Sequence, residues 1–300
     1  MKLNTLILKD KRVFNQFLGL KEHSLSVYSF QNIYIWKALF DIEWQVIEDC
    51  LCIFFKDNFG AFLYLTPQGK NQNPLVVKKA FEIMDSFNSN KDISRIENIE
   101  ESDVDFYQNL GLECREKSCD YLCFRKDLAG LEGDKFKSKR ASFNYFTKHY
   151  DFEYASYTIK DKKGCLKLYD HWMRDRAKTN SDPLYRGMLL DSRKSLQQAF
   201  DNYKDLDFIG GAVKINKEIK GFTFGFKLNK DTFCILYEIT DLSIKGLAQF
   251  IFREFCRELK GFKYINIMDD SGLENLKKVK LSYHPEKLIR AYIAQRKDYA

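Results

Sequence analysis

The sequence contains few of the residues that are typical of flexible chains. Only 4 of its 300 residues are proline and 15 are glycine, so disordered regions and low-complexity linkers are not expected. Aromatic residues are abundant, with 26 Phe and 17 Tyr. A chain of this length folds as one large domain or as two domains of about 150 residues each. We therefore expect a globular protein whose core is rich in aromatic rings.

Long hydrophobic runs are also missing. A membrane-spanning helix needs about 18 or more consecutive apolar residues, and no stretch approaches that length. The apolar run near the first residue is too short for the hydrophobic region of a secretion signal. The net charge of +7, from 49 basic and 42 acidic residues, favours anionic partners without indicating a dedicated nucleic-acid-binding protein. We expect a cytoplasmic protein that has no transmembrane segment.

The common motifs for metals and catalytic nucleophiles do not occur either. Two close cysteine pairs, Cys50 with Cys52 and Cys119 with Cys123, lack the spacing of a zinc site. Most of the eight cysteines lie in apolar runs, where a reduced cysteine is a small core residue. The four histidines are scattered, and no Walker loop or Ser-His-Asp order is present. We expect reduced cysteines, no bound metal and no tightly bound cofactor.

Hydrophobic periodicity and turn residues predict an alternation of helices and strands. Asn73-Pro74 is typical of a helix start, because Asn is a favoured N-cap residue and Pro is tolerated in the first turn. The sequence Ser271-Gly-Leu-Glu274 is typical of a capping box at the start of a second helix. In the first part we predict helices over 24–40, 74–87 and 104–110, strands over 44–56, 61–65 and 93–97, and a strand pair over 112–125.

The second part has the clearer pattern. We predict helices over 166–178, 246–259 and 271–283, and strands over 208–215, 221–228, 232–239, 264–268 and 288–295. Three antiparallel strands, a helix, a strand, a helix and a last strand is the order of a GNAT domain, in which two neighbouring strands splay apart to admit the acyl donor. Other α+β folds share this pattern, so the element order alone leaves them open.

Three blocks of residues carry a resemblance to a known family. They are the helix Tyr28-Ser-Phe-Gln-Asn-Ile-Tyr-Ile-Trp36, the segment 127–146 and the segment 264–285. In this order they resemble the C-terminal domain of phosphatidylglycerol lysyltransferases and the stand-alone bacterial proteins grouped with it. The chain departs from that family's pattern at Ala141, Ile239, Ile267 and Met268. The last three departures remove charges near the expected cleft.

The resemblance implies an α+β protein of two GNAT-like halves, each a mixed, mostly antiparallel sheet flanked by helices. We place these halves at 1–130 and 131–300, with the active cleft in the second. It also implies a transferase related to enzymes that move amino acids from aminoacyl-tRNA onto lipids or peptidoglycan precursors. Aminoacyl-tRNA is then the donor, and tRNA and anionic lipid are the expected partners.

Acyl transfer requires a base for the acceptor, a donor for the oxyanion and an acid for the leaving group. Glu238 is an ionisable residue in an apolar strand, on the face expected to carry Cys234 and Leu236, where desolvation would raise its pKa towards that of a useful base. Tyr283 lies where GNAT enzymes commonly present a phenol as general acid. Asp270 follows a buried strand and is the third catalytic candidate. The alternatives are a water-facing Glu238, a core-packed Tyr283 and an Asp270 that only compensates the helix dipole.

Basic and polar residues are the candidates for substrate binding. Lys280 falls on the inward stripe of its helix, so its ammonium must reach solvent or meet an anion. The basic segment after residue 134 suits nucleic acid because phosphate contacts are combined with aromatic rings, although a charged, solvated connector explains it equally well. The complete set of substrate-binding candidates is Lys135, Lys139, Arg140, Asn144, Asn266, Asp269, Lys277 and Lys280.

Two alternatives to aminoacyl transfer remain. The first is a CoA-dependent N-acetyltransferase, with acetyl-CoA as the donor. CoA-dependent GNAT enzymes cradle the pyrophosphate in a glycine-rich loop at a helix start, whereas 242–248 supplies the single glycine Gly246. The second is a non-catalytic binding protein that retains the fold.

Overall fold

The computed structural model describes residues 2–297, which form two compact units. Unit 1 comprises 2–120, 269–272 and 288–297 of the described chain, and unit 2 comprises Tyr121–Met268 and Leu273–Lys287. These bounds differ from the predicted halves, 1–130 and 131–300, because the last strand returns to the first unit. None of the described helices combines the length and the apolar character needed to cross a membrane.

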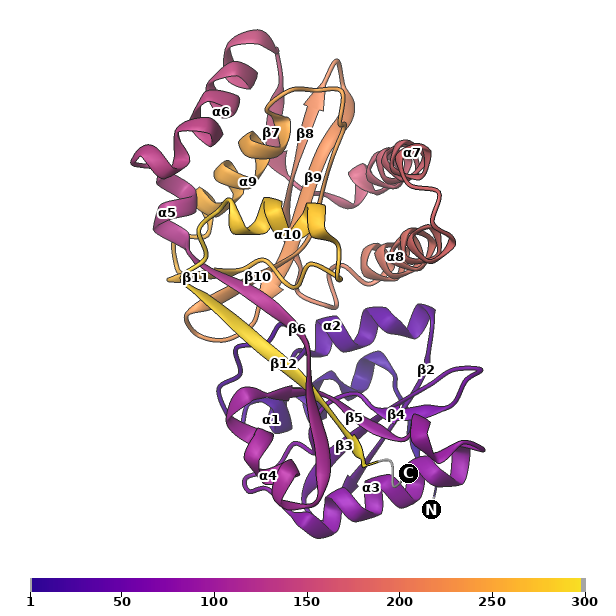
Figure 1. Ribbon diagram of the computed structural model, residues 1–300. Helices are drawn as coiled ribbons and strands as arrows, with labels where there is room; N and C mark the ends of the chain where they lie inside the picture. The colour runs from indigo at the N-terminus through magenta and orange to yellow at the C-terminus, as the bar shows by residue number, and fades with distance from the viewer. Residues whose placement is uncertain (1, 298–300) are drawn as a thin grey trace. The chain divides into compact units, whose positions relative to one another are not determined.

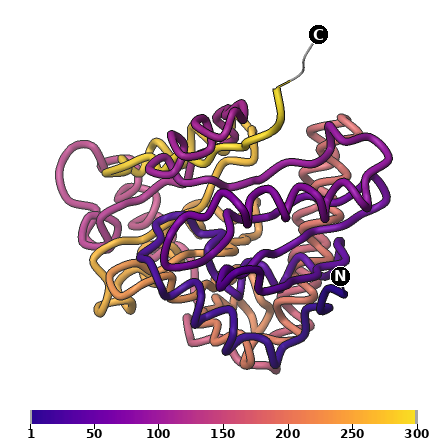
Figure 2. Tube along the Cα trace, turned by 90° about the horizontal axis from the view of Figure 1, so that it is seen from below, coloured from indigo at the N-terminus to yellow at the C-terminus, as the bar shows by residue number. Residues whose placement is uncertain are grey.

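Unit 1 contains a mixed sheet in the order β1-β2-β3-β4-β5-β12. Its strands are β1 (Asn4–Thr5), β2 (Asp41–Ile47), β3 (Cys50–Lys56), β4 (Ala61–Leu63), β5 (Arg95–Glu100) and β12 (Lys287–Arg296). The β4–β5 pair is parallel, whereas β12 runs antiparallel to β5. The yellow C-terminal strand in Figure 1 is β12, and the same yellow segment leads to the C-terminus in Figure 2.

The predicted single strand over 44–56 is wrong. The chain instead forms the β2–β3 hairpin, whose turn residues Glu48 and Asp49 have φ values of 43° and 60°. Two consecutive residues with positive φ match the right-handed twist of a hairpin. Since neither residue is glycine or asparagine, the sequence contains little signal for this turn.

Helix α3 (Pro74–Phe87) covers one face of the unit 1 sheet. Asn73 caps it by accepting a hydrogen bond from the Leu75 backbone N–H, which confirms the predicted helix start. Its apolar side packs against the side chains of Cys50, Cys52 and Phe54 on β3. The other helices of unit 1 are α1 (Lys11–Leu18), α2 (Phe30–Ile35) and α4 (Val104–Asn109).

In unit 2 the strands follow the hydrogen-bonded order β6-β11-β10-β9-β8-β7, and their pairing is again mixed. Its strands are β6 (Leu112–Phe124), β7 (Glu153–Ser156), β8 (Ile209–Ile215), β9 (Glu218–Lys227), β10 (Thr232–Thr240) and β11 (Tyr264–Asn266). Strands β10 and β11 are parallel, whereas the pairs β6–β11, β9–β10, β8–β9 and β7–β8 are antiparallel. β6 is one continuous strand, so the strand pair predicted over 112–125 is wrong; it begins in unit 1 and ends in unit 2.

Helices cover both faces of the unit 2 sheet (Figure 1). One face carries α5 (Arg125–Gly130), α6 (Lys137–His149) and α9 (Leu247–Glu258), and the other carries α7 (Lys162–Thr179) and α8 (Pro183–Asp201). The basic segment after residue 134 is therefore helical. Helix α8 was not predicted, although Asp182 as N-cap and Pro183 in the first turn are start signals of the kind that identified α3.

The last helix, α10 (Glu274–Leu281), starts differently from the prediction. Leu273 occupies the N-cap position without a side-chain hydrogen bond, and Ser271 has a left-handed backbone with φ of 53°. The predicted capping box is therefore wrong, and Tyr283 lies just beyond the helix. Short 3-10 helices cover Leu8–Asp10, Trp36–Ala38, Lys91–Ile93, Glu101–Asp103, Asp134–Phe136 and Ile159–Asp161.

Candidate active site

Strand β10 carries the carboxylate of Glu238 beyond the point where the pairing of β10 with β11 ends. The parallel register with β11 covers three positions and ends at Cys234 opposite Asn266, so the rest of β10 continues past the end of β11. On the other edge, the register with β9 shifts between Ile235 and Tyr237. Leu236 is thus the extra residue of a β-bulge, and Glu238 follows it on the part of β10 that β11 does not pair.

The bulge determines which face of the sheet Glu238 occupies. Tyr237 packs against Phe224, with 5.3 Å between ring centroids, and its hydroxyl donates to the carbonyl of Ser192 on α8 at 3.0 Å. Glu238, the next residue, is opposite Thr223 on β9 and points to the other face, which α6 and α9 cover. The predicted face shared with Cys234 is wrong, because Cys234 is opposite Phe226 and the extra residue breaks the alternation.

Glu238 lies in a desolvated environment. Burial raises the pKa of this carboxyl to about 8, and the nearby ammonium groups of Lys139 and Lys280 act in the opposite direction. The side chain is partly buried, and it forms no hydrogen bond or ion pair with any residue in 2–297. A carboxyl group that changes its charge near neutral pH without a fixed partner is suited to accept a proton from a substrate.

Lys139 approaches this site from α6. Its Nζ lies 4.1 Å from the centroid of the Tyr283 ring, within the range of a cation–π contact. Burial lowers the pKa of Lys139, while the charge of Glu238 works against that change. The ammonium therefore lies over Tyr283 and interacts electrostatically with Glu238.

Tyr283 is buried, with 7% of its surface exposed, and its ring packs against Phe252 at 4.5 Å between centroids. Burial, and then the charge of Glu238, raise the pKa of Tyr283 well above its ordinary value. The phenol therefore keeps its proton at physiological pH. Its hydroxyl makes no hydrogen bond within the described part of the chain, which leaves the proton available to a bound substrate.

Lys280 fixes the end of strand β11. Its ammonium donates hydrogen bonds to the carbonyls of Ile267 and Met268, the second at 3.2 Å, and lies 5.8 Å from the Tyr121 ring centroid. Met268 has a left-handed backbone with φ of 59°. Lys280 therefore stabilises the turn that follows β11, a role that the inward position on its helix did not predict.

Lys280→Met is expected to destabilise the protein by about 1–3 kcal/mol, because two carbonyl acceptors at the end of β11 lose their donor. Urea unfolding measures this change. Lys277→Met is the matched control, since Lys277 is exposed and only reaches Glu274 at 3.8 Å; its effect should stay within about 0.5 kcal/mol. Equal unfolding free energies for the two variants would show that the carbonyl contacts contribute nothing.

A comparison with family models identifies the family of the whole chain. The family model described as "Phosphatidylglycerol lysyltransferase, C-terminal" matches residues 19–295. The chain belongs to this family. Among curated proteins, none matches the sequence significantly.

Solved structures show the fold of this phosphatidylglycerol lysyltransferase C-terminal family member. A conserved protein of unknown function from Bacteroides thetaiotaomicron is 28% identical, with 99% of this chain and 100% of the other covered and a TM-score of 0.87. The L-PGS of Bacillus licheniformis is 14% identical, with 99% and 94% covered and a TM-score of 0.69. A tandem GNAT protein from clavulanic acid biosynthesis is 8% identical, with 100% and 99% covered and a TM-score of 0.53.

These likenesses confirm the predicted tandem GNAT-like α+β fold. Family and fold together support an acyl or aminoacyl transferase of the GNAT type.

The structure brings four of the predicted site residues together in unit 2, namely Glu238, Tyr283, Lys139 and Lys280. Three others are exposed side chains on helix surfaces or beside them: Lys135, Asn144 and Lys277. Lys135 pairs with Asp127 at 3.2 Å. Their proposed roles in substrate binding remain predictions.

Three of the remaining predicted residues hold backbone turns in this family member. Arg140 donates to the carbonyls of Leu131 and Gly133, and Asn266 accepts a hydrogen bond from the Met268 N–H at 2.7 Å. Asp269 and Asp270 belong to unit 1, and Asp270 accepts from the Gly272 N–H at 2.9 Å. Binding or catalytic roles for these residues remain predictions.

Two residues next to the site were not predicted from the sequence. Phe252 and Cys256 lie one turn apart on α9, and Phe252 supports the Tyr283 ring. Burial, and then the charge of Glu238, raise the pKa of the Cys256 thiol well above its ordinary value. The i, i+4 spacing on the apolar stripe of α9 was the available signal, but it also describes any core pair.

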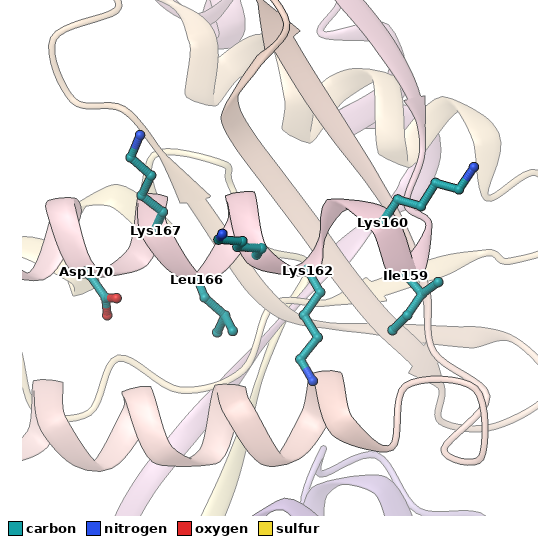
Figure 3. A pocket seen from close by; sticks show the side chains of 7 residues that line it. Ile159, Lys160, Lys162, Leu166, Lys167 and Asp170 are labelled. Carbon is teal, nitrogen blue, oxygen red and sulfur yellow. The ribbon is translucent and has the colours of Figure 1, made fainter.

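Two cavities lie on the other face of the unit 2 sheet, along α7. They have volumes of about 490 and 440 Å³. Figure 3 shows the first, in which Ile159, Lys162 and Leu166 project to one side of the helix, whereas Lys160 and Lys167 project to the opposite side. Neither cavity is lined by Glu238 or Tyr283, so both are separate from the candidate active site.

Proposed function

We propose that this protein transfers an aminoacyl group from aminoacyl-tRNA to a hydroxyl or amine acceptor, with Glu238 as general base and Tyr283 as general acid. The observation that carries the proposal is the juxtaposition of a carboxyl of pKa about 8, a protonated phenol and an ammonium beside the part of β10 that extends past its pairing with β11. These are the groups that acyl transfer requires.

These groups account for every proton that moves in the transfer reaction. Glu238 takes the proton from the acceptor as its oxygen or nitrogen forms a bond with the ester carbonyl carbon of the donor. Lys139 stabilises the negative charge that develops on the carbonyl oxygen. The bond to the ribose oxygen of the tRNA then breaks, and that oxygen receives the Tyr283 proton. Proton return from Glu238 to Tyr283 through solvent restores the starting state.

Packing at the start of α9 favours aminoacyl-tRNA over CoA as the donor. Gly246 has a φ of 85°, and a Cβ at this position would lie 2.1 Å from the carbonyl oxygen of Ser142 on α6. The helix start that would receive a CoA pyrophosphate is therefore packed against α6. A phosphatidylglycerol-like lipid is the acceptor that the family description supports, and a cytoplasmic location fits a tRNA-dependent donor.

The decisive experiment incubates the purified protein with radiolabelled aminoacyl-tRNAs, or with CoA thioesters, and vesicles containing phosphatidylglycerol. Labelled lipid formed only with aminoacyl-tRNA is the expected result. Turnover with CoA thioesters alone would identify an acetyltransferase-like enzyme. Retention of charged tRNA or lipid without any turnover would identify a binding protein. Either of the last two results overturns the proposal.

Tyr283→Phe is expected to slow transfer by about 10-fold to 100-fold, because the leaving oxygen loses its proton donor. Unfolding free energy should change by less than about 0.5 kcal/mol, since the hydroxyl holds no partner in the described chain. Tyr237→Phe is the matched control with the opposite expectation. It loses the bond to Ser192, so stability falls by about 1 kcal/mol while transfer is unchanged. A Tyr283→Phe variant with full activity would exclude the phenol as the acid.

A further inference from the structure

A polar cleft lies between α7 and the β8–β9 hairpin in unit 2. It has a volume of about 440 Å³, which is the size of a small-ligand site. Its lining holds five lysines against three acidic residues, an excess of two positive charges. The lysines are Lys160, Lys167, Lys214, Lys217 and Lys220, and the acidic residues are Asp161, Glu218 and Asp241.

Two buried carboxylates hold lysines in the wall of this cleft. Asp161, 7% exposed, pairs with Lys214 at 2.8 Å and accepts hydrogen bonds from the Thr158 N–H and hydroxyl. Asp241, also 7% exposed, pairs with Lys220 at 3.4 Å. Lys214 and Lys220 are therefore fixed in position by the fold, because a buried carboxylate that lost its partner would be costly.

Three further ammonium groups border the cleft without a counter-charge. Lys160, Lys167 and Lys217 form no ion pair with any residue in 2–297. Lys160, in the 3-10 helix before α7, and Lys167 on α7 project to the same side in Figure 3. Like charges gathered at one cleft repel each other, and a multivalent anion relieves that repulsion.

Glycine shapes the floor of the cleft. A Cβ at Gly164 on α7 would lie 2.6 Å from Cγ1 of Ile219 on β9. The absence of a side chain therefore lets α7 approach the hairpin closely, and Ile219 provides an apolar surface beneath the lysines. This is the combination of apolar floor and convergent polar groups expected in a small-molecule site.

We propose that this cleft binds a small phosphate-bearing ligand, at a second site on the opposite face of the sheet from Glu238. Lysine ammonium groups are compact charges that bind phosphate oxygens well. The cleft holds lysines and His171 but no arginine, phenylalanine, tyrosine or tryptophan, so the large aromatic side chains typical of single-stranded nucleic-acid sites are missing from its lining.

Inorganic pyrophosphate is the probe, and isothermal titration calorimetry at low salt measures its binding. The double variant Lys167→Met/Lys217→Met is expected to bind roughly tenfold more weakly or worse, because two uncompensated charges are lost. Both side chains are exposed, so the fold should persist, and an unchanged Tm verifies this. Lys260→Met, an exposed lysine away from the cleft, and Glu238→Gln should bind pyrophosphate like the wild type.

A second experiment, with lipid vesicles, distinguishes binding of free phosphates from binding of lipid headgroups. Sedimentation with phosphatidylglycerol vesicles should show no dependence on Lys167 and Lys217. If the double variant loses vesicle binding and the wild type binds no measurable pyrophosphate, the proposal is overturned in favour of a membrane-contacting surface. Absence of pyrophosphate binding by the wild type, or equal binding by all variants, would also overturn it. Because each arm measures binding, the result is independent of whether the proposed transfer reaction occurs.

Discussion

Glu238→Gln is expected to stabilise the protein above pH 8 while removing most of its transfer activity. The carboxyl has an ordinary pKa of 4.5 and a folded-state pKa of about 8. The folded state therefore holds this proton more tightly than the unfolded state does. Stability falls as pH rises from 4.5 through 8, and above 8 the full cost of a desolvated carboxylate is present.

Glutamine has nearly the same shape and carries no charge, so the variant avoids this cost. A tenfold change in proton affinity corresponds to about 1.4 kcal/mol, and we expect a gain of about 2–4 kcal/mol at pH 9. At pH 4.5 the wild type and the variant should have similar stability. Urea unfolding at a series of pH values measures the difference.

Activity should move in the opposite direction. Removing a general base costs about 10²-fold to 10⁴-fold in rate, and glutamine cannot accept the acceptor's proton. The wild-type rate should rise with pH and level off above about 8, since only the ionised carboxyl is active. The variant should lose this rise.

Glu286→Gln is the matched control, because Glu286 is exposed in the same unit. It should show neither the gain in stability at alkaline pH nor the loss of rate. If the stability difference between wild type and Glu238→Gln stays constant from pH 5 to pH 9, the carboxyl is not desolvated. If the rate of Glu238→Gln equals that of the wild type, another group is the base.

Local signals predicted several elements of this fold. The start of α3 followed from Asn73-Pro74, since both residues act within the first turn of the helix they begin. The shared face of Phe222, Phe224 and Phe226 followed from the two-residue repeat of a strand, and all three are buried. Glu238 was found as an ionisable residue in an apolar strand, a signal that needs no tertiary information.

Features that depend on distant residues could not be predicted in this way. The bulge at Leu236 leaves no mark in the sequence, yet it decides the face that Glu238 occupies. The meeting of Lys139 with Tyr283 joins positions far apart in the chain. Lys280 was placed on the inward side of its helix, but its carbonyl partners depend on how the chain turns after β11. Tertiary packing therefore sets the geometry of the site, whereas local pattern sets most of its elements.

Gly225 lies where this tertiary packing is tightest. On β9 it is opposite Ile209 of β8 on one edge and Ile235 of β10 on the other, so its backbone is fixed from both sides. A Cβ at this position would lie 1.9 Å from the carbonyl oxygen of Cys234 and 2.9 Å from its carbonyl carbon. Backbone atoms in the middle of a sheet cannot move aside as a flexible side chain can.

Gly225→Ala is therefore expected to cost about 3 kcal/mol or more, or to prevent folding, because β9 and β10 must separate to admit the methyl group. Transfer activity should fall as well, since Ile235 begins the bulge that orients Glu238. Urea unfolding and the transfer assay measure the two effects.

Gly187→Ala on α8 is the matched control. No atom lies within 4 Å of its added Cβ, so the same substitution should stabilise this helix by about 0.5–1 kcal/mol. If Gly225→Ala is as stable as the wild type, β9 and β10 do not pack as closely as in this structure. The bulge between them would then not account for the orientation of Glu238.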